Sequence, residues 1–97
     1  IVAAAVLKEE DERWKDNAPS LYVHNFVSKP SQQPYGKIFL KEAKKQAKKW
    51  QKSYLRLDSA VDNKALAMYY TKLGFQTVGS CEDGPYQGIL RQKRIIK

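Results

Sequence analysis

The sequence predicts an α/β domain built on a mixed β-sheet that is flanked by helices. Segments of strand character lie before and after two segments of helical character, in the order strand, strand, helix, strand, helix, strand, strand. A strand on either side of a helix favours a parallel pair at the centre of the sheet. The length of 97 residues fits one domain, and 42% hydrophobic with 11% aromatic residues is a globular composition.

Two strands are expected at the start of the chain. Residues 1–7 (IVAAAVL) are apolar and partly β-branched, and residues 21–27 (LYVHNFV) are rich in aromatic and β-branched side chains. Asp16, Asn17 and Pro19 are turn formers in the polar connection between them. Because the chain opens inside a strand-like segment, we expect all of it to form a single domain that is incomplete at its N-terminus.

A first helix is predicted over residues 37–52. The preceding residues 28–36 contain two prolines and a glycine and are expected to form a loop. Two tryptophans, Trp14 and the one at the end of this helix, are expected to pack in the core. The predicted apolar stripe of the helix recurs at spacings of three, four and three: Leu40, Ala43, Ala47 and Trp50.

The same helix is strongly basic. It contains seven lysines and one acid, Glu42, a formal charge of +6 in a chain that carries +8. An anionic partner, whether nucleic acid, an acidic protein or a phosphorylated cofactor, is one interpretation. A solvated lysine face is the other. The lysines are Lys37, Lys41, Lys44, Lys45, Lys48, Lys49 and Lys52.

A third strand and a second helix are predicted next. Residues 54–57 alternate as a strand does, and residues 58–63 carry turn and cap residues, of which Asp62 or Asn63 can cap the following helix. Gly74 is a suitable residue to end that helix. Its apolar side is predicted to contain Leu66, Tyr69 or Tyr70, and Leu73.

The chain is predicted to end in a β-hairpin. Residues 75–80 and 88–96 have strand character, and the turn-forming segment CEDGPYQ joins them. Cys81 within it is the only cysteine, so neither an internal disulfide nor a cysteine-based metal site is expected. No apolar run approaches the roughly 20 residues that span a bilayer. We therefore expect a cytoplasmic protein that uses no metal and no membrane.

One segment carries a specific motif. Asn63 opens the second helix, Tyr70 follows seven residues later, and the sequence from Lys72 to Phe75, KLGF, leads into the next strand through Gly74. With the preceding LRLD strand, this register resembles the cofactor-binding core of GNAT-superfamily N-acetyltransferases. The resemblance implies a GNAT-like fold without its N-terminal strand and first two helices. It also implies direct transfer of the acetyl group of acetyl-CoA to a primary amine.

The resemblance implies roles for single residues. Tyr70 would protonate the departing CoA thiolate, since it has the register of the family's general acid. His24, on the second strand, is the candidate general base, and a half-buried structural histidine is the alternative. The carboxylates of the acidic connection are further candidates for the base. These are Glu9, Glu10, Asp11 and Glu12.

The cofactor would occupy a gap between the second and third strands, which splay apart in this family. Backbone groups of Phe26, Val27 and Ser28 would pair with the pantetheine arm, and Asn63 would contact it. The pyrophosphate would bind the loop that leads into the first helix, where exposed N–H groups attract anions. That loop departs from the family pattern, because it is shorter, Pro34 lacks an amide donor and a second small residue is absent. Its candidate ligands are Gln33, Tyr35, Gly36 and Lys37.

Two other classes of function remain as alternatives. A non-catalytic GNAT-like domain would bind CoA without turnover. A nucleic-acid-binding module would use the lysines of residues 37–52 as a phosphate-binding patch, although they are spread around the helix. An exposed terminal strand pair also makes a homodimer reasonable.

Overall fold

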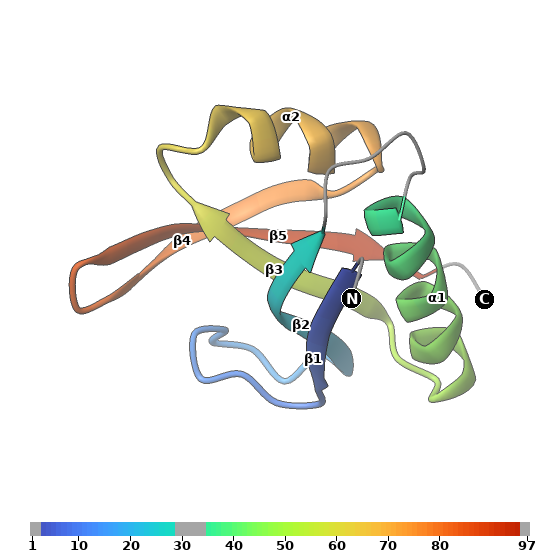
Figure 1. Cartoon of the computed structure of the whole chain (residues 1–97). Coiled ribbons are helices and arrows are strands. Elements are labelled where there is room, and N and C mark those ends of the chain that lie inside the picture. Colours follow the sequence, from blue (N-terminus) through green and yellow to red (C-terminus); the bar gives the residue numbers. More distant parts are fainter. Residues whose placement is uncertain (1–2, 29–34, 96–97) are drawn as a thin grey trace.

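The computed structural model describes residues 3–28 and 35–95 of the chain. Five strands and two helices follow one another in the predicted order (Figure 1). Their bounds are β1 (Ala3–Lys8), β2 (Ser20–Ser28), α1 (Tyr35–Lys49), β3 (Tyr54–Ala60), α2 (Lys64–Lys72), β4 (Gln76–Asp83) and β5 (Tyr86–Arg94).

The strands form one mixed sheet in the order β1-β2-β3-β5-β4. The central strands β2 and β3 are parallel and are connected through α1, whereas β1 with β2, β3 with β5 and β5 with β4 are antiparallel. A parallel pair at the centre of a mixed sheet was predicted from the strands that surround the first helix, and it is confirmed. The parallel pair matters because the candidate site lies between its two strands.

Both helices pack on one face of the sheet, where the main core lies. Alternate residues of β2 and β3 face the helices, and α1 contributes the predicted stripe of Leu40, Ala43 and Ala47. The prediction for Trp50 is wrong, because α1 ends at Lys49 and Trp50 is 45% exposed. The sheet and α2 complete this core with Leu21, Val23, Leu55, Leu57, Tyr70, Phe75 and Ile95.

A second, smaller cluster lies on the opposite face of the sheet. Trp14, from the connection between β1 and β2, packs against Tyr22 of β2 and Leu90 of β5, with Cys81 of β4 beside them. The core position predicted for Trp14 is therefore confirmed. Because β-strand side chains alternate between faces, Tyr22 belongs to this cluster and its neighbours Leu21 and Val23 to the other.

Strand β3 is longer than predicted, and the hairpin loop is shorter. Asp58, Ser59 and Ala60, expected in a turn, pair with Leu90, Ile89 and Gly88 of β5. The last pair of the β4–β5 hairpin is Asp83 with Tyr86, so only two residues form the turn. Gly84 is one of them and has a φ of +60°, which glycine adopts without steric cost. Pairing with β5 therefore outweighs the turn propensity of Asp58.

The basic helix α1 exposes most of its lysines, and Lys45 pairs with Glu42 at 3.3 Å along the helix. Neither helix in the described part of the chain is long and apolar enough to cross a membrane. The first turn of α1 has no acidic residue, and its last turn carries Lys48 and Lys49. The positive end of the helix dipole is therefore not neutralised by a side chain of its own first turn.

Candidate active site

The two central strands are paired over only part of their length. Within the described residues, β2 and β3 pair from Ser20 with Tyr54 to Tyr22 with Arg56, which we call the paired half. Beyond this point the strands diverge, and we call this region the split half; the divergence is visible between the arrowheads of β2 and β3 in Figure 1. The splay that the GNAT resemblance implied is therefore present.

Strand β2 carries a bulge in the split half. Ala4 of β1 pairs with Val27 and Val6 pairs with His24, so β2 has one more residue than β1 between these pairs. A bulge bends a strand and changes the direction of its backbone groups, and bulges are frequent beside active sites. The sequence had no glycine or proline at this position to indicate it.

A cavity of about 380 Å³ lies at the split half. The helix-covered side of the sheet contributes Val23, Leu57 and Tyr70, all members of the main core. Residues from the other side line it as well, so the cavity reaches both faces at the point where the strands part. Those residues are Arg13, His24, Asp58 and Tyr86.

Tyr70 is the residue of α2 that is most deeply placed in this cavity. It is only 3% exposed, and its ring makes edge-on contacts with Tyr69 and Phe75. Burial raises the pKa of Tyr70 to about 12. The phenol therefore keeps its proton at neutral pH and is available as a hydrogen-bond donor.

His24 comes from β2 and approaches a carboxylate of the β1–β2 connection. Its Nε2 is buried and lies 3.0 Å from Oδ2 of Asp11, without the alignment of a full hydrogen bond. The Asp11 side chain is 6% exposed, and that of His24 is 19% exposed. The structure therefore brings His24 to the same cavity as Tyr70 and adds Asp11 behind it.

Asp58 and Tyr86 are residues of the cavity that the sequence did not identify. The Tyr86 hydroxyl donates to Oδ2 of Asp58 at 2.5 Å, and Arg13 Nη1 lies 3.6 Å from Oδ1 of the same carboxylate. Burial, followed by this hydrogen bond, raises the pKa of the Tyr86 phenol. Arg13 also donates to Asp83 at 2.9 Å. Extending the alternation of β3 past residue 57 would have placed Asp58 on the face of Arg56.

The predicted cofactor ligands that the structure describes come from the starts of the two helices and from the end of β2. Asn63 is the N-cap of α2, as the sequence predicted, and its Oδ1 accepts from the Leu66 amide at 3.1 Å. Gly36 is buried and Lys37 is exposed, in the first turn of α1, which Tyr35 opens. Phe26, Val27 and Ser28 belong to the split half of β2. Gln33 lies outside the described residues.

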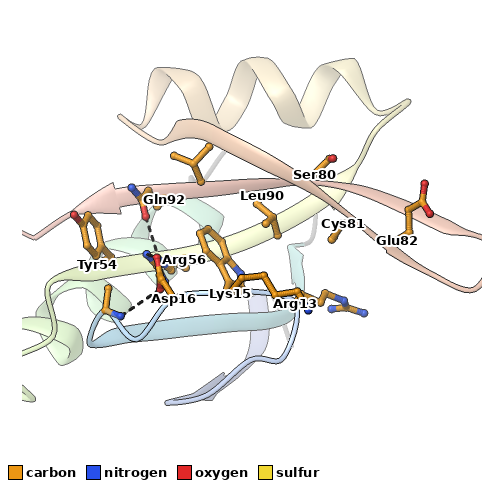
Figure 2. A pocket seen from close by; sticks show the side chains of 13 residues that line it. Arg13, Lys15, Asp16, Tyr54, Arg56, Ser80, Cys81, Glu82, Leu90 and Gln92 are labelled. Atoms are coloured by element: carbon orange, nitrogen blue, oxygen red, sulfur yellow. Dashed lines mark hydrogen bonds and ion pairs between the residues drawn. The ribbon is translucent and has the colours of Figure 1, made fainter.

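A second cavity, of about 730 Å³, lies on the sheet face opposite the helices. Figure 2 shows Arg13, Lys15 and Asp16 of the β1–β2 connection gathered there with side chains from β3, β4 and β5. At its centre Arg56, 2% exposed, donates to both carboxylate oxygens of Asp16 at 2.7 and 2.8 Å and lies 4.2 Å from the Trp14 ring centroid. This cavity lies at the paired half, away from Tyr70.

The described residues contain no cluster of three or more His, Cys, Asp or Glu side chains that could hold a metal.

Comparison with solved structures identifies the fold. A GNAT-family acetyltransferase from Listeria monocytogenes matches with a TM-score of 0.78 at 21% identity, over 97% of this chain and 58% of that one. The ribosomal-protein-S18-alanine N-acetyltransferase from Escherichia coli gives 0.71 at 19% identity, over 99% and 63%. The NatC complex bound to Gag peptide and CoA gives 0.74 at 13% identity, over 98% and 62%. This chain has the fold of the GNAT-superfamily N-acetyltransferases.

The chain spans about three fifths of the length of these three neighbours. No protein-family model and no curated protein matches the sequence. At such identities the likeness establishes the fold alone.

Proposed function

We propose that this chain is the cofactor-binding part of an acetyl-CoA-dependent N-acetyltransferase that acts on a primary amine. The observation that carries the proposal is the split half, where one cavity is lined by Tyr70 of α2 and His24 of β2. A protonated phenol and an imidazole are a suitable acid and base for acyl transfer to an amine. Acetyl-CoA would supply the activated thioester.

The shape of the split half suits the pantetheine arm. Val27 and Ser28 pair with Ala4 and Ala3 of β1. Within the described residues, the β3-facing edge of Phe26, Val27 and Ser28 has no strand partner. An extended ligand can pair with such an edge as an added strand does. One N–H of this edge would donate to the thioester carbonyl and stabilise the negative charge that develops there.

The start of α1 suits the phosphates of the cofactor. Gly36 has no side chain to block the approach of a ligand to the backbone, and no acidic side chain of the first turn competes for the N–H groups at the start of the helix. Lys37 would add a cation, with Gln33 and Tyr35 completing the loop. Asn63 would contact the pantetheine from the start of α2.

Tyr70 and His24 would move the protons. The substrate ammonium would first give one proton to His24, and the resulting neutral amine would form the new C–N bond as the C–S bond breaks. Tyr70 would protonate the departing thiolate and would be reprotonated by the second proton, which the nitrogen releases after attack. The raised pKa of Tyr70 keeps the donor protonated until that moment, and the exclusion of water raises the basicity of the thiolate that receives the proton.

Binding of CoA tests the cofactor assignment. We expect a rise in melting temperature of roughly 10 °C at 100 times Kd, where linkage contributes about 2.7 kcal/mol. Lys37→Ala should weaken CoA binding, whereas Lys45→Ala removes the same charge from the middle of α1 and should leave the affinity unchanged. Absence of any shift or heat at millimolar CoA would refute the assignment. If both variants weakened CoA binding equally, the general positive charge of α1, and not a phosphate site at its first turn, would account for the binding.

A measurement of turnover distinguishes the proposed enzyme from a non-catalytic CoA-binding domain. Release of CoA thiol is measured with acetyl-CoA and a panel of primary amines that includes small amines, an aminoglycoside and peptides with free N-termini. Tight CoA binding without thiol release would favour a non-catalytic CoA-binding domain. Salt-dependent binding to generic DNA, with no CoA binding, would instead favour the nucleic-acid-binding alternative for the lysines of α1.

A further inference from the structure

The contact between His24 and Asp11 joins two segments that the sequence treated separately. Nε2 of His24 faces the β1–β2 connection, and the nearest carboxylate oxygen, Oδ2 of Asp11, is 3.0 Å away. Nε2 is buried, so water does not compete for it, and its contact with the carboxylate is electrostatic because the pair lacks the alignment of a full hydrogen bond. His24 is the single histidine of the chain.

The Asp11 carboxylate is held in place from its other side. Its Oδ1 accepts the backbone N–H of Arg13 at 2.9 Å, and the Trp14 N–H donates to the Asp11 carbonyl at 3.1 Å. The carboxylate is therefore part of a local turn that fixes its rotation. Its second oxygen is left to face the imidazole, and at 6% exposure the side chain has little freedom to turn away.

This arrangement determines which ring nitrogen carries the proton of a neutral imidazole. A neutral imidazole has one N–H donor and one acceptor nitrogen, and an ionised carboxylate only accepts. Because the negative charge of the carboxylate lies 3.0 Å from Nε2, it attracts the ring N–H to this nitrogen, and the proton is favoured on Nε2. The lone pair that can accept a proton from a substrate is then on Nδ1.

We propose that Asp11 is a positioning residue for His24, which fixes the imidazole in the Nε2-protonated tautomer and leaves Nδ1 as the base. The catalytic part of this inference rests on the proposed acetyltransferase function, whereas the tautomer does not. Asp11 is one of the four acidic residues that the sequence offered as candidate bases, and it has a different role here. Asp11 acts through His24 and does not itself take the proton of the amine.

The exchange of Asp11 for asparagine tests the tautomer directly. In Asp11→Asn the side-chain Oδ1 can still accept from Arg13 N–H, so the local turn is kept. The amide nitrogen replaces Oδ2 and donates to Nε2, which forces the ring proton onto Nδ1. The same exchange in a serine-protease triad leaves the geometry intact and gives the wrong tautomer. Glu10→Gln is the matched control, because it removes one negative charge from the adjacent residue.

The ¹⁵N shifts of the imidazole report the tautomer, and a single histidine makes their assignment unambiguous. At a pH alkaline enough to leave the ring neutral, we expect the Nε2-protonated form in the wild type and in Glu10→Gln. In Asp11→Asn we expect the Nδ1-protonated form. A wild-type spectrum with the proton on Nδ1 would overturn the proposal, and this measurement needs no variant to fold. An unchanged tautomer in a folded Asp11→Asn would overturn it as well.

Activity then tests the catalytic role. With an amine that the wild type accepts, Asp11→Asn should lower kcat about 100-fold, the lower end of the range for general acid–base catalysis, with the KM for acetyl-CoA unchanged. An inverted tautomer with wild-type kcat would refute the catalytic role and leave the structural one. If the chain binds no CoA, the proposed function fails while the spectra still decide the role of Asp11.

Discussion

The paired half and the split half of strands β2 and β3 differ in what lies between and beside the two strands. In the paired half, Arg56 is surrounded by Asp16, Trp14 and Tyr54, and its charge is matched by a carboxylate in bidentate geometry. In the split half, the hydrogen bonds between the strands are absent from the described residues, and polar side chains line a cavity instead. Side-chain contacts therefore accompany the backbone pairing in the paired half, whereas the split half has a cavity where the strands part.

The contrast extends to the ionisable groups. Although burial disfavours a charged guanidinium, the hydrogen bonds to Asp16 and Tyr22 hold the pKa of Arg56 above its ordinary value, and Arg56 lowers the pKa of the Asp16 carboxyl. In the split half, burial raises the pKa of Tyr70 and stabilises a neutral group. The paired half therefore holds a charged pair in its ionised form, whereas Tyr70 in the split half keeps its proton at neutral pH.

Removal of the Tyr70 hydroxyl should have the largest effect and should be confined to catalysis. Tyr70→Phe keeps the ring contacts with Tyr69 and Phe75 and removes only the proton donor. We expect kcat to fall about 10²- to 10⁴-fold, on the order of 3 to 5 kcal/mol in the barrier, with acetyl-CoA affinity nearly unchanged. Thiol-release kinetics and calorimetry measure the two quantities.

Tyr69→Phe is the control for this experiment, since Tyr69 contacts the Tyr70 ring and is only half-buried. Its kcat should remain close to that of the wild type. Wild-type kcat in Tyr70→Phe would exclude Tyr70 as the general acid. A large loss of melting temperature would instead show that the split half depends on this hydroxyl for stability.

Removal of the Asp16 charge should lower the stability of the fold and leave CoA binding at the split half unchanged. Asp16→Asn leaves the buried Arg56 without its ionised partner. We expect a loss of about 1 to 2 kcal/mol in the free energy of unfolding, the lower end for bonds to charged groups, because the Asp16 side chain is 55% exposed and solvent screens it. Urea unfolding measures the loss, and CoA affinity should not change.

The same pair predicts a dependence of stability on pH. Because the folded-state pKa of Asp16 is lowered, mainly by its hydrogen bond from Arg56, its contribution is fully present above the unfolded-state pKa. It is lost as the pH falls through the lower folded-state value. The stability difference between wild type and Asp16→Asn should therefore shrink in acid. A constant difference down to pH 2 would contradict the ion pair.

Asn63 gives the smallest effect and separates capping from cofactor binding. Asn63→Ala should cost about 1 kcal/mol of stability through loss of the cap, whereas Asn63→Gly should cost only a few tenths. Both variants lose the amide that would contact the pantetheine. If Asn63 binds cofactor, both weaken CoA binding equally, as read by calorimetry. If the loss of CoA affinity is instead large in Asn63→Ala and small in Asn63→Gly, as the loss of stability is, the role of Asn63 is only to cap the helix.

Local patterns explain why much of the fold was predictable. The α1 stripe, the cap at Asn63 and the helix end at Gly74, which has a φ of +94°, depend on neighbours a few residues away. The error at Trp50 has a simple cause, since the helical period continues through residue 50 while the helix stops one residue earlier and Gln51 adopts a φ of +60°. A spacing pattern contains no information about where the backbone leaves the helix.

The sequence by itself determined the order of the elements, the parallel pair at the centre of the sheet and the candidates Tyr70 and His24. Only the tertiary structure placed Asp58 beside Tyr86, Asp11 beside His24 and Arg56 beside Asp16. Asp58 and Tyr86 are 28 residues apart and Arg56 and Asp16 are 40 apart. Such contacts depend on strand register, on the bulge in β2 and on the path of a polar connection. These features follow from pairing across the whole sheet, which no local spacing encodes.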